Sequence, residues 1–328
     1  MDNNHIFNEK WNHDKIVIER AKKILSVDKM LMIGSCFSRN MIRWLQDSGI
    51  ILNNSPWEII YNPFSLYYEF QRVYNNLKWQ NYVTMERNKE NDSIIFRDAW
   101  RTWIEGNNLT DMEIKNFNID RMAKVYIESS NTFVFIMTLT EVWCCKKEPM
   151  IIMNRVPIKS MIDKSSDLWT NRFMDYNEIV STLSKLINLI FGIKPNCNIV
   201  LMVCPIPLKF TASRKNIKVA NNLSKSLLIC SIHEICTKFS NVEYFPLFEI
   251  VETMLRTDSC FYQDDNRHVI PEVIDLVMRV FIENYANHDL NYNHLIGKFA
   301  IPKVDIDGKV VGKLKLAKHL SKEKYLCK

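Results

Sequence analysis

Short, uniformly apolar segments alternate with longer amphipathic segments along this sequence, and that alternation limits the fold more than any other feature. The apolar segments have the length of buried strands and lie at residues 29–33, 133–139, 198–204 and 242–245. Apolar side chains at helical spacing mark residues 37–46, 64–80, 111–128, 175–191, 221–239 and 271–285. Strands that alternate with helices favour a mostly parallel sheet covered on both faces. We therefore predict an α/β fold, a three-layer sandwich around a mostly parallel central sheet.

The domain organisation follows from the absence of an internal linker and from the distribution of charge. No Pro-, Gly- or Ser-rich stretch divides the chain, so we predict one domain at 1–296 with its core at about 29–285. Residues 297–328 form a basic C-terminal extension with nine lysines and three acidic residues, which accounts for the net charge of +6. The neutral main domain gives no support to nucleic-acid binding. The extension predicts an acidic partner, such as an anionic lipid surface or a charged glycan, and a solvated tail is the alternative.

Neither end of the sequence nor its cysteines indicate export. Residues 1–15 are polar, and no uncharged apolar stretch has the length that crosses a bilayer. The nine cysteines are odd in number and show no paired C-x-x-C spacing. We therefore expect a cytoplasmic protein with reduced thiols, no transmembrane segment, no metal site and no cofactor.

The first candidate site lies between the first apolar strand and its helix, at Gly34, Ser35 and Cys36. Ligand sites of open α/β sheets lie beyond the carboxyl ends of the strands, and a helix N-terminus offers N–H groups to an oxyanion. Ser35 is therefore a candidate nucleophile, and a simple helix N-cap is the alternative. Cys36 can be reactive beside the helix N-terminus, but adjacent side chains on a turn diverge, so we favour a packed cysteine. Gly49 stands where the helix needs a C-terminal cap.

Two further polar segments are candidates for the same site. Asp265 and His268 lie three residues apart in a polar loop, where the carboxylate can orient the imidazole as a general base. A solvated acidic loop is the alternative. Thr140 and Glu141 follow the second apolar strand and precede a predicted hairpin at 143–153. They can bind substrate or complete an oxyanion site, and Glu141 can equally be a structural hydrogen-bonding residue.

Aromatic and basic side chains indicate two binding surfaces, each with a plainer alternative. Tryptophans that can stack on sugars, or simply pack in the core, are Trp57, Trp79, Trp100 and Trp103. Basic residues that can bind an acidic substrate group, or form a solvated loop, follow the third apolar strand at Lys209, Arg214, Lys215 and Lys218.

Taken in order, these motifs resemble the GSCFA family of the SGNH (GDSL-like) hydrolase superfamily. The similar segments are GSCFS at 34–38, NPFS at 62–65, TLTEVW at 138–143, VCPIP at 203–207, NNLSK at 221–225, YFPLFEI at 244–250 and the DxxH loop. The resemblance implies an SGNH/flavodoxin-like sheet and a triad of Ser35, Asp265 and His268. It also implies an acyl-enzyme on Ser35, in an esterase or O-acyltransferase whose substrate is an acylated sugar or polysaccharide precursor.

The sequence departs from the family pattern in two places. Ser38 stands where the family name has alanine. The glycine and asparagine that complete the superfamily's oxyanion hole are not recognisable, so Asn62 and Thr140 become candidates, with the N–H of Ser35 or Cys36. A non-catalytic glycan- or protein-binding module with the same fold is therefore the alternative function.

Overall fold

The structure, a computed structural model, describes most of the chain as two compact units. The described residues are 29–50, 52–75, 83–87, 94–98, 100–101, 103–146, 152–153, 169–257, 262–263, 265, 267–285, 301–304 and 310–314. The larger unit is Ser26–Tyr244, and the smaller one combines Met1–Leu25 with Phe245–Lys328. The predicted boundary at 296/297 lies outside the described residues.

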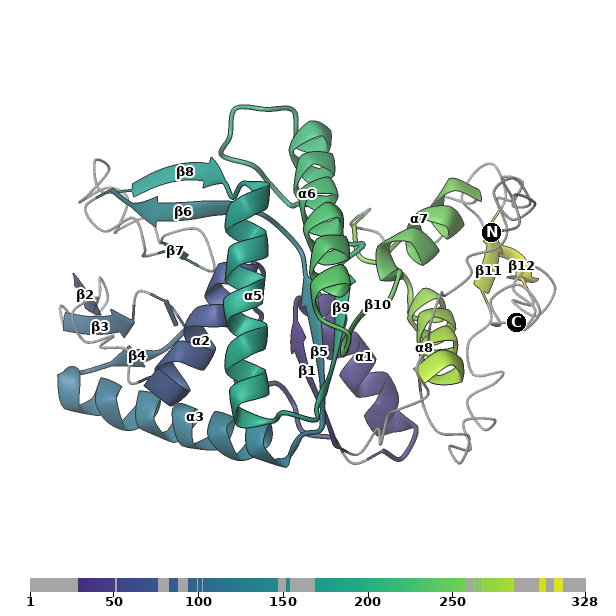
Figure 1. The fold of residues 1–328 in the computed structure, drawn as a ribbon. Helices are drawn as coiled ribbons and strands as arrows, with labels where there is room; N and C mark the ends of the chain where they lie inside the picture. Colours follow the sequence, from purple (N-terminus) through teal and green to yellow (C-terminus); the bar gives the residue numbers. More distant parts are fainter. Residues whose placement is uncertain are drawn as a thin grey trace. The chain divides into compact units, whose positions relative to one another are not determined.

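A four-stranded parallel sheet forms the centre of the larger unit (Figure 1). Its order is β1 (Met30–Gly34), β5 (Thr132–Met137), β9 (Asn198–Val203) and β10 (Val242–Tyr244), and each neighbouring pair is parallel. Every residue of β1 and β5 is buried. These strands are apolar throughout, rather than alternating, because both faces of the sheet are covered. The predicted α/β fold with a parallel central sheet is confirmed.

Helices flank this sheet. α1 (Cys36–Asp47) packs against β1, and α6 (Ile217–Lys238) packs against β9 and β10. α5 (Tyr176–Ile193) lies beside α6 and contacts α2 (Pro63–Asn75), which in turn contacts α3 (Leu109–Ser129). α1 ends at Asp47, and Gly49 follows the C-cap residue Ser48 with a φ of +85°, which confirms the predicted glycine at this helix end. α6 begins before residue 221, because the side chain of Asn216 caps it by accepting from the N–H of Lys218.

Two small antiparallel sheets accompany the central sheet. One contains β2 (Val83–Arg87), β3 (Ile94–Asp98) and β4 (Glu105–Gly106). The other contains β6 (Glu141–Cys145), β7 (Ile152–Met153) and β8 (Trp169–Phe173). β6 and β7 pair as the predicted hairpin, whereas β2, β3, β4 and β8 were not predicted.

The smaller unit has its own aromatic core. Phe245 makes an edge contact with Phe281 at 5.3 Å between ring centroids, and Phe281 stacks on Tyr285 at 5.2 Å. Its elements are α7 (Leu247–Thr257), α8 (Pro271–Tyr285) and an antiparallel hairpin of β11 (Ile301–Val304) and β12 (Val310–Leu314). In the described part of the chain, no helix combines the length and apolar character needed to cross a membrane.

Candidate active site

Ser35 occupies the junction between β1 and α1, at the carboxyl end of the strand. Its Oγ accepts a hydrogen bond from the N–H of Phe37 at 3.3 Å, so Ser35 is the N-cap of α1. Its own N–H donates to the carbonyl of Ile136 in β5 at 3.3 Å, and the residue is 0% exposed. The capping role that the sequence left open is therefore observed, at the position predicted for the nucleophile.

Gly34 explains why Ser35 sits so close to the end of β5. A Cβ on Gly34 would lie 2.4 Å from the carbonyl oxygen of Ile136 and 2.8 Å from its Cβ. Both distances are shorter than a carbon atom tolerates, so only glycine allows the two strands to approach here. The glycine before Ser35 thus sets the geometry of the sheet edge at which Ser35 lies.

Cys204 and Lys225 also belong to this edge, although neither was assigned to the site from the sequence. The Ser35 hydroxyl donates to Cys204 Sγ at 3.0 Å, and Cys204 follows β9 directly. Lys225 lies on α6 and is 1% exposed. Its Nζ donates to the carbonyls of Thr138 at 2.7 Å and Ile206 at 3.2 Å, which lie just beyond β5 and β9.

Lys225 places a buried positive charge at this edge of the sheet. Burial lowers the pKa of Lys225 to about 8, and the thiols of Cys204 and Cys36 act in the opposite direction. Among the residues that the structure describes, no carboxylate forms an ion pair with Lys225. One sequence signal marks this lysine, because it continues the buried stripe of α6 at the helical spacing of Leu228, Ile232 and Ile235.

The segment before α2 bonds to the carboxyl ends of β1 and β5, and it carries Asn62. The N–H of Ile60 donates to the Gly34 carbonyl at 2.9 Å, and the carbonyl of Tyr61 accepts from the N–H groups of Thr138 and Leu139. Asn62 is 0% exposed, and its Oδ1 caps α2 by accepting from the N–H of Ser65 at 2.8 Å. The structure therefore brings Asn62 close to Ser35 along the sheet edge and gives its carbonyl oxygen a capping role.

Thr140 and Glu141 contact the two segments that follow β9. The N–H and the hydroxyl of Thr140 bond to Ser224 Oγ on α6, at 3.3 and 3.2 Å. The Glu141 carboxylate accepts from Thr211 Oγ1 at 2.6 Å and from the N–H of Ala212 at 2.7 Å. Both carboxylate oxygens thus hold the loop between β9 and α6, which favours the structural alternative for Glu141.

Cys36 is the first residue of α1 and is half-buried. Its thiol acts electrostatically on Lys225, so Cys36 also lies at this edge. None of the seven described cysteines forms a disulfide. Among the described residues, no group of three or more His, Cys, Asp or Glu side chains is placed to hold a metal ion.

Asp265 and His268 lie in the smaller unit, where the structure brings them together as their spacing predicted. Asp265 Oδ2 is 2.5 Å from His268 Nδ1, and Asp265 Oδ1 accepts from the N–H of His268 at 2.9 Å. The backbone N–H and then the ring of His268 lower the pKa of Asp265 to about 2. The loop is closed by Gln263, which bonds to the carbonyls of His268 and Val269. Ser35 belongs to the larger unit, Ser26–Tyr244, whereas Asp265 and His268 belong to the smaller one.

These segments match one protein family in sequence order. Residues 29–281 match the model of the GSCFA family. The chain belongs to the GSCFA family. The match begins at β1 and ends within α8, so it includes Ser35, Lys225, Asp265 and His268. No curated protein and no solved structure matches the chain.

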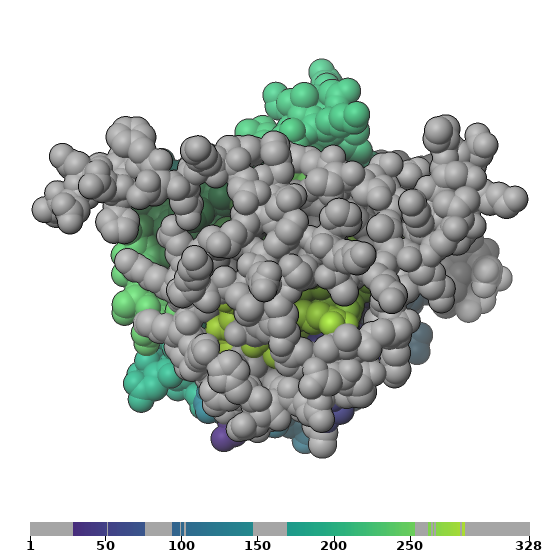
Figure 2. Space-filling view, turned by 90° about the vertical axis from the view of Figure 1, so that its right-hand side faces the viewer, coloured from purple at the N-terminus to yellow at the C-terminus, as the bar shows by residue number. Residues whose placement is uncertain are grey.

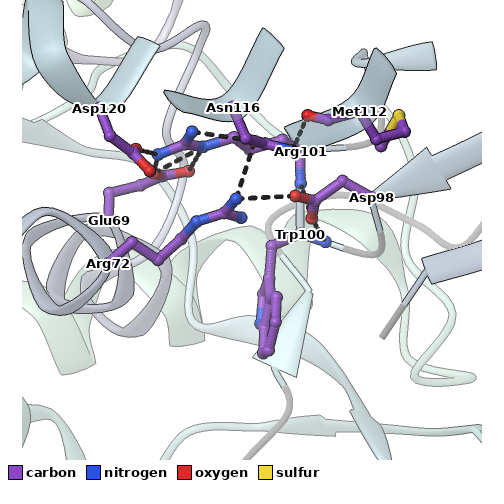
Figure 3. Close-up of polar contacts among 8 residues, drawn as sticks. All are labelled: Glu69, Arg72, Asp98, Trp100, Arg101, Met112, Asn116 and Asp120. Carbon is purple, nitrogen blue, oxygen red and sulfur yellow. Dashed lines mark hydrogen bonds and ion pairs between the residues drawn. The ribbon is translucent and has the colours of Figure 1, made fainter. Parts of the chain in front are cut away.

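This GSCFA protein also buries a second polar cluster, which joins α2, α3 and the end of β3 (Figure 3). Arg101 Nη2 is 2.5 Å from Glu69 Oε2 and 2.5 Å from Asp120 Oδ1. Arg72 Nη2 bonds to Asp98 Oδ2 at 2.8 Å, and Asn116 Oδ1 accepts from both arginines. Burial works to lower the pKa of Arg101, but attraction and hydrogen bonding by Glu69 outweigh it and raise the pKa. We refer to these six residues as the charge cluster.

Of the candidate tryptophans, Trp57 and Trp100 pack in the interior, whereas Trp103 is only half-buried. Trp57 and Trp100 are 2% and 5% exposed. Their rings contact Phe70 and Tyr68, each at 5.3 Å between centroids. Burial of these two rings favours the packing alternative. Trp79 lies outside the described residues.

Proposed function

We propose that this GSCFA protein is a serine-dependent esterase or O-acyltransferase of the SGNH type, with an acylated sugar or polysaccharide precursor as substrate. The observation that carries the proposal is the place of Ser35, at the carboxyl end of β1 in the central parallel sheet and at the N-terminus of α1. Parallel α/β sheets bind their ligands at that edge. The carbohydrate part of the proposal rests on the family resemblance.

The proposed acyl transfer uses the side chains of Ser35, His268 and Asp265. Ser35 Oγ attacks the ester carbonyl while His268 takes its proton, and the protonated imidazole then gives that proton to the leaving alkoxide. An acyl group remains on Ser35 until water, or a sugar hydroxyl deprotonated by His268, displaces it. Asp265, whose pKa is about 2, stays ionised and stabilises the imidazolium. The proposal requires that Ser35 and His268 come within hydrogen-bonding reach in the reacting protein.

Two of the candidate oxyanion donors already have hydrogen-bond partners, whereas Asn62 and the N–H of Cys36 remain candidates. The N–H of Ser35 already donates to Ile136, and the N–H of Thr140 bonds to Ser224. Positive potential at this edge comes from the N-terminus of α1 and from Lys225. In the proposed reaction, charge that develops on the carbonyl oxygen forms within this potential, in a region of low dielectric constant.

One observation favours the second candidate function, a non-catalytic glycan- or protein-binding module. Ser35 is fully buried, and its hydroxyl bonds to Phe37 and Cys204. A serine with these contacts also fits a purely structural role. The two functions differ in whether Ser35 reacts, so activity decides between them.

Hydrolysis of p-nitrophenyl acetate tests the proposal. Ser35→Ala should reduce turnover by roughly 10³-fold or more, as expected for a member of a triad. His268→Ala and Asp265→Asn should each cause a severe loss, because the general base or its orienting carboxylate is removed. Ser48→Ala is the matched control, because Ser48 caps the other end of α1 and its hydroxyl donates to the carbonyl of Trp44 one turn before it. Wild-type activity in Ser35→Ala rules out Ser35 as the nucleophile, and an inactive wild type favours the binding module.

A further inference from the structure

The loop between β9 and α6 and the first turn of α6 carry cations without any anion. Residues 209–219, which we call the projecting loop, contain four basic residues and no acidic residue. The sequence has no Asp or Glu at all between Glu178 and Glu234. All four basic side chains, Lys209, Arg214, Lys215 and Lys218, belong to exposed residues.

The projecting loop also exposes large apolar side chains between its cations. Phe210 is 56% exposed, Ile217 is 38% exposed and Val219 is 55% exposed. In Figure 1 the chain extends upward from the carboxyl end of β9 before it returns into α6, and the same sequence colour stands out at the top of Figure 2. Apolar and basic groups are therefore presented together on one projection.

Several contacts hold the projecting loop in one conformation. The Glu141 carboxylate binds Thr211 and the N–H of Ala212, and Thr211 Oγ1 is 2.7 Å from Ser213 Oγ. Arg214 takes a left-handed conformation with φ of +59°. Below the loop, Asn221 Oδ1 accepts from the N–H of Leu208 at 3.2 Å. Because the backbone is fixed, a partner would bind a preformed surface and would not have to order the loop.

α3 provides a contrast within the same unit. It also exposes apolar side chains, among them Ile114 at 57% and Phe117 at 65%. Its charges are balanced, however, with four acidic and three basic residues, and its lysines pair at i, i+4 with Asp111 and Glu128. Among the described residues, exposed apolar side chains therefore coincide with an excess of basic residues in the projecting loop and not on α3.

We propose that the projecting loop docks this protein on an anionic lipid surface, with Phe210 entering the interface between headgroups and acyl chains. Basic side chains are attracted to anionic headgroups, and aromatic and aliphatic side chains lose water when they enter the interface. A soluble polyanion satisfies the cations but gives Ile217 and Val219 nothing apolar to contact. The combination of both side-chain classes favours a bilayer.

Sedimentation with vesicles of phosphatidylcholine, with and without phosphatidylserine, tests this proposal on the full chain. The wild type should bind only the vesicles that contain phosphatidylserine, and salt should release it. Phe210→Ala should weaken binding roughly tenfold, because an interfacial aromatic side chain is lost. Arg214→Glu combined with Lys215→Glu should weaken it roughly a hundredfold, because two cations become anions. These side chains are exposed, so we expect unchanged thermal unfolding in both variants.

Two controls separate the projecting loop from other causes of binding. Phe117→Ala removes an equally exposed ring from α3 and should bind as the wild type does. Ser35→Ala should also bind normally, since docking does not depend on the proposed chemistry. The lysines of 297–328 are the same in every variant, so they cannot produce a difference between variants.

Four results overturn the proposal. One is a wild type that does not distinguish the two vesicle compositions, and another is an equal loss in Phe117→Ala and Phe210→Ala. A third is unchanged vesicle binding by Phe210→Ala when the charge-reversed variant is released, which indicates a purely electrostatic contact. The fourth is retention on heparin without any binding to vesicles, which indicates a soluble polyanion.

Discussion

The charge cluster and the carboxyl end of the central sheet around Ser35, which we call the Ser35 edge, both lie in the larger unit. They differ in whether their positively charged side chains are compensated by carboxylates. In the charge cluster, each arginine faces a carboxylate, and Asn116 joins the two arginines (Figure 3). At the Ser35 edge, Lys225 bonds to two backbone carbonyls and lies near two thiols. One region compensates its cations with anions, whereas the other keeps a cation among neutral groups.

This difference shows which of the two regions is suited to chemistry. In the charge cluster the two arginines lie among three carboxylates, so no positive potential is left over, and the network serves to hold α2, α3 and β3 together. An uncompensated cation next to a serine leaves positive potential for a charge that develops later. Burial of such a cation costs stability, and groups of this kind concentrate at functional sites. Substitutions in the charge cluster and at the Ser35 edge test this difference.

The largest effect is expected from Arg101→Met, in the charge cluster. The substitution leaves Glu69 and Asp120 without the guanidinium between them, and loss of one partner from a buried ion network costs roughly 3–5 kcal/mol. The control is Arg97→Met, which breaks the ion pair with Glu105 on the surface of the same sheet and should cost roughly 1 kcal/mol or less. Unfolding by urea measures both. Equal costs would mean that the charge cluster contributes no more than a surface pair.

Lys225→Met tests the buried cation at the Ser35 edge, through the pH dependence of the free energy of unfolding. The pKa of Lys225 is about 8 when folded against 10.5 for the free side chain. Below pH 8 the lysine is protonated in both states, and the cost of its burial is present in full. Between these pKa values the folded protein releases the proton that the unfolded chain keeps, so wild-type stability rises with pH.

At about 1.4 kcal/mol per pKa unit, the expected gain is roughly 3 kcal/mol. Lys225→Met lacks it, so the difference in unfolding free energy between wild type and variant should change by that amount across the interval. Titrations of tyrosines, and of cysteines that do not interact with Lys225, occur in both proteins and cancel in the difference. Parallel curves would show that Lys225 is not a destabilised buried cation.

A smaller effect is expected from Gly34→Ala, which tests the close approach of β1 to β5. The added Cβ collides with the backbone of Ile136, and forced overpacking of this kind costs roughly 1–3 kcal/mol. Gly192→Ala is the matched control, because no atom lies within 4 Å of the Cβ position at that residue of α5. Alanine is the better helix former, so the control should be neutral or more stable by up to about 1 kcal/mol. Equal destabilisation of both variants would contradict the strand contact.

The central sheet was predictable because its strands are uniformly apolar. β1, β5 and β9 contain almost no polar residue, so their burial on both faces could be inferred directly. β2 and β3 mix charged and apolar residues without a clear period, and β4 is two residues long. Those strands form through pairing with one another, which local pattern does not show.

The site was predictable only where its residues lie close together in the sequence. Asp265 and His268 are close in sequence, so their pairing follows from local spacing. Lys225 was not assigned because a lysine in an amphipathic helix is normally solvated, although its position on the stripe of buried residues marked it. The charge cluster joins residues from Glu69 to Asp120, and only the tertiary fold brings them together.

Labelling with a fluorophosphonate probe tests the central claim, that Ser35 is an activated nucleophile, most directly. The account predicts that the wild type and Ser48→Ala are labelled and that Ser35→Ala is not. It also predicts slower labelling of His268→Ala, because the general base is missing. The modified peptide, identified by mass spectrometry, should contain Ser35. A folded wild type that resists the probe, or a label that persists in Ser35→Ala, would contradict the claim.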